Sequence, residues 1–170
     1  ASFGAKGVIV HGGSVGEGGD ISVGYDNWRK ALEHVEDTGM RVLVENTAGG
    51  KNSVARYMDS IERLWEVIGH LNVGLCLDTC HTWAGGIPTI DAVKGFKKLV
   101  KKIDLIHFND SKDGFESSRD RHENLGKGKI PKEELEYVIK NAKTDIIVET
   151  PNGPDAQKKD IAWIRRRLKK

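Results

Sequence analysis

The sequence predicts an α/β protein built around a parallel sheet of five strands. Five short apolar runs, mostly of Val, Ile and Leu, lie at residues 8–10, 42–44, 73–77, 103–106 and 146–148. Such nearly continuous runs are typical of strands that are buried on both faces of a parallel sheet. Longer amphipathic stretches separate them, so that strand, loop and helix patterns alternate five times.

The stretches between the runs have the three-to-four-residue periodicity of helices. The first covers residues 28–35 and is followed by Gly39, and the second covers residues 55–68 and is followed by Gly69. Glycine just beyond a periodic stretch is a common helix stop signal. Pro131, which suits a first helical turn, opens the fourth stretch. We therefore expect about five βα units.

Two architectures fit five such units: an open doubly wound sheet, or part of an eight-stranded βα barrel. An open sheet that binds nucleotides usually carries a Gly-rich phosphate loop after its first strand. Here the loop at residues 11–19 has scattered glycines but no Lys-Ser/Thr ending, and residues 21–25 separate it from the helix. A dinucleotide or P-loop site is therefore weakly supported, and both architectures remain open.

The composition is that of an ordinary globular protein. Of the 170 residues, 38% are hydrophobic and 31% are charged, and the net charge of +2 is too small to indicate nucleic-acid binding by itself. No apolar run approaches the roughly 20 residues of a membrane-spanning helix, and no signal peptide opens the chain. Cys76 and Cys80 lack the spacing of a zinc knuckle. We expect a cytoplasmic protein with reduced thiols and no membrane partner.

The five apolar runs all end in a histidine or a carboxylate. The residues are His11, Glu45, Asp78, His107 and Glu149. Because parallel strands point the same way, these side chains should lie at one end of the sheet, which in a barrel is the active-site face. The alternative is that such residues merely cap strand ends, but five of them together favour a site.

This mixture of residue types predicts a metal centre. Imidazole and carboxylate ligands suit zinc, manganese or iron, whereas calcium prefers oxygen alone. Three converging carboxylates would repel one another unless a cation lay between them. His81, Asp120 and His122 lie in two following loops and could reach the same place. Eight candidate ligands exceed the four of one zinc ion, so a multinuclear site is the simplest interpretation.

Several motifs that contain these residues resemble those of the endonuclease IV family. The matching segments are residues 10–14, 43–49, 76–81, 107–112, 120–122 and 149–151. They follow the family's order across nearly the whole chain, and the longer ones are specific. The resemblance implies a TIM-type (β/α) barrel. Residues 1–170 would be a single domain that forms the C-terminal portion of a (β/α)8 barrel, here incomplete.

The resemblance also implies three zinc ions, with Mn²⁺ as an alternative metal. Glu45 would bridge the first two ions, with His11 on the first. Asp78, His107 and Glu149 would complete the second, and His81, Asp120 and His122 would hold the third. Glu149 and Glu45 are the expected catalytic residues, Glu149 being the candidate for orienting the attacking hydroxide or taking its proton.

The implied activity is DNA repair. The substrate would be double-stranded DNA with abasic sites, cut by hydrolysis of the phosphodiester 5′ to the lesion, and 3′ blocking groups would also be removed. Lys112, Arg119 and Arg121 lie within or between the motifs at residues 107–112 and 120–122 and are candidate DNA contacts, although exposed cations often only meet solvent. No obligate protein partner is expected for the complete enzyme.

The chain departs from the family pattern in two ways. Family members have roughly three more βα units before His11, including a further histidine ligand, and this chain also lacks an initiator Met. Five strands cannot close an eight-stranded barrel, so we expect exposed sheet edges. Glu116 stands where the family usually has glycine, and a positive φ there would be strained.

Two other functions remain as alternatives. Metal-dependent sugar isomerases and epimerases share the barrel and its metal carboxylates, and turnover of a keto-sugar would identify them. A non-catalytic metal-binding fragment is the other alternative, and it predicts fewer than three tightly bound zinc ions.

Overall fold

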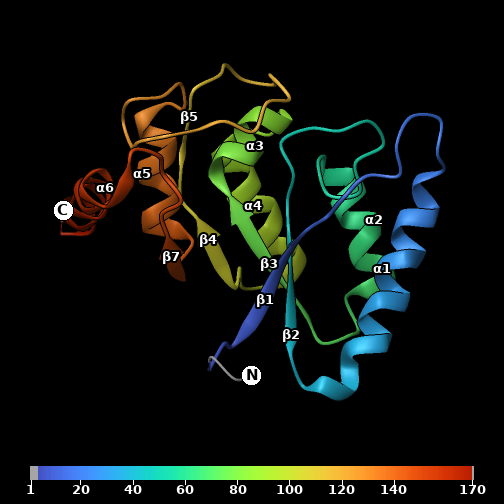
Figure 1. Cartoon of the computed structure of the whole chain (residues 1–170). Helices are drawn as coiled ribbons and strands as arrows, with labels where there is room; N and C mark the ends of the chain where they lie inside the picture. Colours follow the sequence, from blue (N-terminus) through green and yellow to red (C-terminus); the bar gives the residue numbers. More distant parts are fainter. Residues whose placement is uncertain (1–3, 170) are drawn as a thin grey trace.

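The computed structural model describes residues 4–169 and has a parallel five-stranded sheet at its centre (Figure 1). The strands are β1 (Gly7–His11), β2 (Arg41–Glu45), β3 (Val73–Asp78), β4 (Leu105–His107) and β7 (Asp145–Ile147). Their spatial order, β1-β2-β3-β4-β7, is also their order along the chain. All four strand pairs are parallel. This sequential order excludes the doubly wound sheet and confirms an incomplete barrel of five βα units.

Helices connect the strands and cover one face of the sheet. They are α1 (Ile21–Val35), η1 (Glu36–Thr38), α2 (Met58–Ile68), α3 (Thr79–Gly85), α4 (Thr89–Val100), α5 (Lys132–Asn141) and α6 (Gly153–Leu168). A sequential strand order with right-handed crossovers places the crossover helices in one layer. Successive long helices in that layer pack against one another. An antiparallel ribbon of β5 (Asp110–Ser111) and β6 (His122–Glu123) lies beside α3.

The core lies between the central strands and the helical layer. Leu75 and Leu77 of β3 and Ile106 of β4 are fully or almost fully buried, together with Leu64 and Phe96 of the helices that cross over them. Residues with helical periodicity therefore pack against nearly continuous apolar strands, as the sequence predicted.

The expectation that every strand is buried on both faces is wrong at the two edges. Val8 and Val10 of β1 are 47% and 41% exposed, and Ile147 of β7 is 47% exposed. Both strands have a neighbour on one side only. The exposed edges that we expected are thus present in the part of the chain that the structure describes.

The second expectation that needs correction concerns residues 79–85, which form the short helix α3 and not a loop. Asp78 caps this helix because its Oδ1 accepts a hydrogen bond of 2.8 Å from the His81 backbone N–H. The helix directs the His81 side chain back toward the strand end. No helix among the described residues is both long and apolar enough to cross a membrane.

Candidate metal centre

The strand-end residues converge as predicted. His11, Glu45, Asp78 and His107 are the last residues of β1, β2, β3 and β4, and the strand register places His11 opposite Glu45 and Asp78 opposite His107. Glu149 differs slightly, because β7 ends at Ile147 and Glu149 follows two residues later. All five side chains still reach one end of the sheet.

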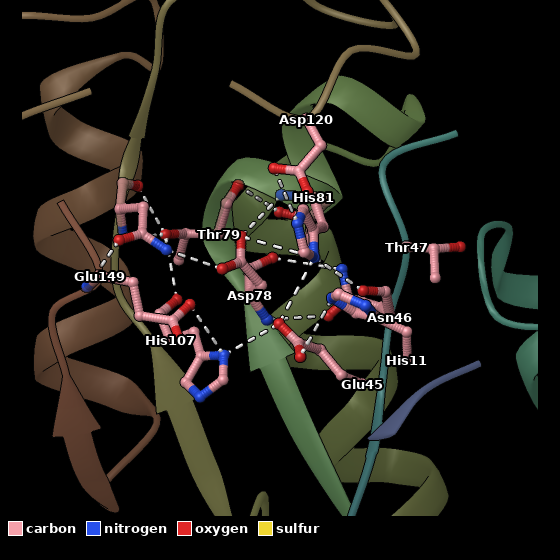
Figure 2. A network of polar contacts seen from close by, with 12 residues as sticks. His11, Glu45, Asn46, Thr47, Asp78, Thr79, His81, His107, Asp120 and Glu149 are labelled. Atoms are coloured by element: carbon pink, nitrogen blue, oxygen red, sulfur yellow. Dashed lines mark hydrogen bonds and ion pairs between the residues drawn. The ribbon is translucent and has the colours of Figure 1, made fainter. Parts of the chain in front are cut away.

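Glu45 lies at the middle of this cluster and is only 4% exposed. Its Oε1 is 2.9 Å from His107 Nδ1 and 3.5 Å from His81 Nδ1, and its Oε2 is 3.4 Å from His11 Nε2. His107 Nδ1 is also 3.1 Å from Glu149 Oε2. Figure 2 shows these side chains turned toward one another, so one carboxylate contacts three histidines.

His81, Asp120 and His122 form a second group next to the first. The Oδ1 of Asp120 is 3.1 Å from His81 Nε2 and 3.2 Å from His122 Nε2. The Nδ1 atoms face backbone carbonyls, that of His81 at 2.9 Å from Asn46 O and that of His122 at 3.2 Å from Glu149 O.

This arrangement fixes the tautomer that each ring adopts when it is neutral, as it would be when it binds a metal ion. A backbone carbonyl only accepts, so each neutral ring carries its proton on Nδ1 and leaves a lone pair on Nε2. Neither buried Nε2 makes a hydrogen bond of normal geometry. Two unpartnered imidazole lone pairs beside one carboxylate oxygen are a donor set that suits a divalent cation.

The sequence missed the polar residues behind the candidate ligands. The Asn46 amide donates to Asp78 O at 3.2 Å and accepts from Asp78 N at 2.8 Å. Asn109 donates to Asp78 Oδ2 at 2.7 Å and accepts from Glu149 N at 3.0 Å. Thr79 donates to Asn109 O at 2.6 Å. All three lie within or beside the motifs quoted above, but nothing in their spacing distinguishes ligands from supporting residues.

Negative charge dominates the site. Burial lowers the pKa of His81, but the Asp78, Asp120 and Glu45 carboxylates outweigh it and raise that pKa to about 9. His107 and His122 follow the same pattern, because neighbouring carboxylates overcome burial and raise each pKa. Contacts with His122 and His81 hold the pKa of Asp120 far below its usual range. The excess of carboxylates is therefore relieved by protons or by cations.

We expect the metal-free chain to lose stability as pH rises from 6.5 to 9. The folded pKa of His81 is about 9 and its ordinary value is 6.5, so its contribution is complete below 6.5 and disappears as pH rises through 9. At roughly 1.4 kcal/mol for each pKa unit, the loss is up to about 3.5 kcal/mol. Urea unfolding in chelator at pH 6.5, 7.5 and 9 measures it, and His81→Gln should flatten the profile. An equally steep profile for that variant would contradict the assignment.

The ligand atoms fall into groups small enough to hold a metal ion. Within each group the ligand atoms lie within 4.8 Å of one another. One group consists of His11, Glu45 and His81, and a second of Glu45, Asp78, His107 and Glu149. A third group consists of His81, Asp120 and His122. All of these residues except the fully buried Asp78 line a cleft of about 500 Å³ at the strand ends. Cys80 also approaches Asp78 and His122, but burial raises its pKa to about 12, so the protonated thiol is a poor ligand.

The fold and the position of the cleft agree with the protein family that the sequence matches. A family described as "Xylose isomerase-like TIM barrel" matches residues 1–167. The chain belongs to this family. Its crossover pattern and the position of the cleft at the carboxyl ends of the strands are those of such barrels.

Within the family, similarity to endonuclease IV confirms the resemblance seen in the motifs. A protein of Mycobacterium tuberculosis (strain ATCC 25177 / H37Ra) named "Probable endonuclease 4" is 49% identical over 167 residues. That alignment covers 98% of this chain and 65% of the relative. The protein of the same name from Mycobacterium ulcerans (strain Agy99) is 46% identical over 168 residues, which cover 99% of this chain and 66% of that relative. The chain thus spans about two-thirds of the length of these relatives.

Solved structures with a similar fold include endonuclease IV and a sugar epimerase-like protein. Endonuclease IV from Thermus thermophilus superposes with a TM-score of 0.77 and 29% identity, over 98% of this chain and 62% of that one. A D-tagatose 3-epimerase-like protein superposes with a TM-score of 0.72 over 97% of this chain and 62% of its own chain. Because the two sequences are only 18% identical, this match supports the barrel fold alone.

The loop at residues 112–121, which carries Asp120, contains Glu116, the position for which a positive φ was expected to cause strain. This residue has a φ of +61°, which confirms the expected strain. Its backbone N–H donates to Trp83 O at 3.0 Å, and Ser118 N–H donates to Ala84 O at 2.9 Å, so the loop is fixed on α3. The Trp83 indole of α3 also holds the loop, because its N–H donates to Asp113 O at 3.2 Å.

Glu116→Gly is expected to raise the free energy of unfolding by about 1 kcal/mol. The loop keeps its position on α3, while the strain of a side chain at positive φ disappears. Glu116→Ala retains the β-carbon and serves as the control. Chemical denaturation of the three proteins compares them, and equal stability of both variants would contradict this explanation.

The three basic residues of this loop differ in their surroundings. Arg121 binds both carboxylate oxygens of Asp113, at 2.7 and 2.5 Å, and Arg119 lies 3.8 Å from the same carboxylate. Lys112 is exposed and has no ion pair among the described residues. Lys112 is therefore the least neutralised cation of the three.

Proposed function

We propose that this chain carries the metal-binding portion of an endonuclease IV-type DNA-repair enzyme. It would hydrolyse the phosphodiester 5′ to an abasic site in double-stranded DNA and remove 3′ blocking groups. The observation that carries the proposal is the convergence of all eight motif residues at one end of the sheet. The 49% identity to a protein named "Probable endonuclease 4" supports the choice of reaction within the family.

The donor set fits zinc. His81, Asp120 and His122 would hold one ion, and Glu45, Asp78, His107 and Glu149 would hold another. Glu45 and His11 would contribute to a third position. That last pair is fewer than the three or four protein ligands that zinc sites usually have, so we expect its affinity to be weakest in this chain.

When bound, zinc would lower the pKa of water toward about 7 and neutralise phosphate charge. The chain's own residues would set the geometry for that chemistry. Glu149 is 40% exposed in its side chain and faces the cleft, whereas Glu45 and Asp78 are buried. Glu149 is therefore the carboxylate best placed to orient the attacking water or take its proton.

DNA would approach along the loops that surround the cleft. Lys112 is our first candidate for a phosphate contact, because the neighbouring arginines are already paired with Asp113. Arg119 and Arg121 would reach phosphate only by exchanging that carboxylate for the DNA backbone. We place them second for this reason.

The test offers damaged DNA, undamaged DNA and a keto-sugar to the same zinc-loaded protein. We expect chelator-sensitive nicking of a duplex that contains a tetrahydrofuran abasic analogue, and no cleavage of the matched undamaged duplex. A 3′-phosphoglycolate end would also be removed. Epimerisation of a keto-sugar without nicking would replace this proposal with the sugar-epimerase alternative.

A further inference from the structure

Asp160 is a buried carboxylate outside the proposed ligand set. It lies on α6 and is 4% exposed. No Lys, Arg or His lies within ion-pair distance of it among residues 4–169. A buried carboxylate without a cation is costly unless hydrogen bonds compensate, so its partners indicate what it does.

Three donors surround Asp160. Its Oδ2 accepts from Thr150 Oγ1 at 2.6 Å and from Asn124 Nδ2 at 2.7 Å, and its Oδ1 accepts from Leu125 N at 3.1 Å. Charge-assisted hydrogen bonds of this length are roughly twice as strong as neutral ones. One carboxylate therefore holds two separate segments of the chain.

Each of these segments carries a proposed metal ligand. Thr150 directly follows Glu149, and Asn124 lies two residues after His122. Asn124 reinforces the junction, because its Nδ2 also donates to Pro151 O at 3.1 Å. On the site side, His122 Nδ1 faces Glu149 O at 3.2 Å.

We propose that Asp160 is a positioning residue that fixes Glu149 and His122 relative to each other. The two ligands belong to different proposed metal positions, so Asp160 would keep those positions at a constant separation. This inference rests on the proposed metal-dependent function. It adds to it a structural element on α6, behind the ligands and out of contact with the reacting groups.

Asp160→Asn tests the proposal with little change of shape. An amide has one acceptor oxygen and presents an NH₂ group to the remaining donors, so it cannot satisfy all three hydrogen bonds. Asp155→Asn is the matched control, since Asp155 lies on the same helix with a side chain that is 92% exposed. Thr150→Val removes only the hydroxyl that joins Asp160 to the segment of Glu149, and it decides the matter if Asp160→Asn does not fold.

The primary readout is zinc affinity, measured by competition with a chromophoric chelator at a temperature where each variant is folded. We expect Asp160→Asn to lower the zinc affinity of one or two of the proposed metal positions by about 10- to 100-fold, and Thr150→Val to lower it less. Nicking should show a lower kcat with an unchanged KM, because no DNA contact is altered.

A merely structural role would lower thermal stability but leave the zinc affinity of the folded variants equal to that of Asp155→Asn, and this result would overturn the proposal. The failure of the proposed function has a different signature. In that case the unmutated protein would bind zinc and Asp160→Asn would weaken this binding, but the unmutated protein would not cut abasic DNA.

Discussion

Glu45→Gln is expected to reduce nicking of abasic DNA by about 10³-fold, equivalent to about 4 kcal/mol of activation free energy. Glu45 is the carboxylate that His11, His81 and His107 all approach. The amide has nearly the same shape but carries no charge, and it has only one oxygen with which to bridge two metal positions. Zinc analysis and a single-turnover nicking assay measure the two consequences together.

Glu66→Gln provides the control, because Glu66 is exposed on α2 and belongs to none of the groups of candidate metal ligands. It should retain full zinc content and activity. Normal nicking by zinc-depleted Glu45→Gln would show that the carboxylate cluster is not the catalytic centre.

Asp120→Asn is expected to remove one zinc ion per chain and to lower nicking by about 100-fold. Asp120 Oδ1 is the anionic atom that lies within 3.2 Å of both His81 Nε2 and His122 Nε2. Without its charge, the two imidazoles would hold a cation with neutral donors only. The zinc position that includes Glu45 should stay occupied, so the two positions can be told apart by titration with chelator.

Asp91→Asn, an exposed change on α4, is the comparison for this variant. It should bind as much zinc as the unmutated chain. Loss of all zinc from Asp120→Asn would contradict separate positions and would indicate one indivisible cluster.

The fold could be predicted closely because its signals are local. Apolar runs at β3 and β4 and periodic helices between them determined the number and order of the βα units. The choice between open sheet and barrel could not come from periodicity, since both use the same units, and the motifs supplied it. Burial at the edges was misjudged because Val8 and Ile147 have ordinary strand sequences, and exposure there depends on a missing neighbour.

The candidate site was predictable to the level of residues but not of contacts. A carboxylate or histidine at a strand end has a defined direction in a parallel sheet, so the convergence of Glu45, Asp78 and His107 followed from the sequence. The roles of Asn109 and Asp160 did not follow. Their partners lie 31 and 36 residues away in the chain, and only the folded structure brings these groups together.

Zinc stoichiometry is the measurement that tests the central claim most directly. The chain would be reconstituted with excess zinc, desalted, and analysed by inductively coupled plasma mass spectrometry beside an abasic-site nicking assay with and without chelator. We predict two tightly bound zinc ions per chain, a third at high free zinc, and nicking that the chelator abolishes. Fewer than two ions per folded chain, or nicking that persists after complete zinc removal, would contradict the account.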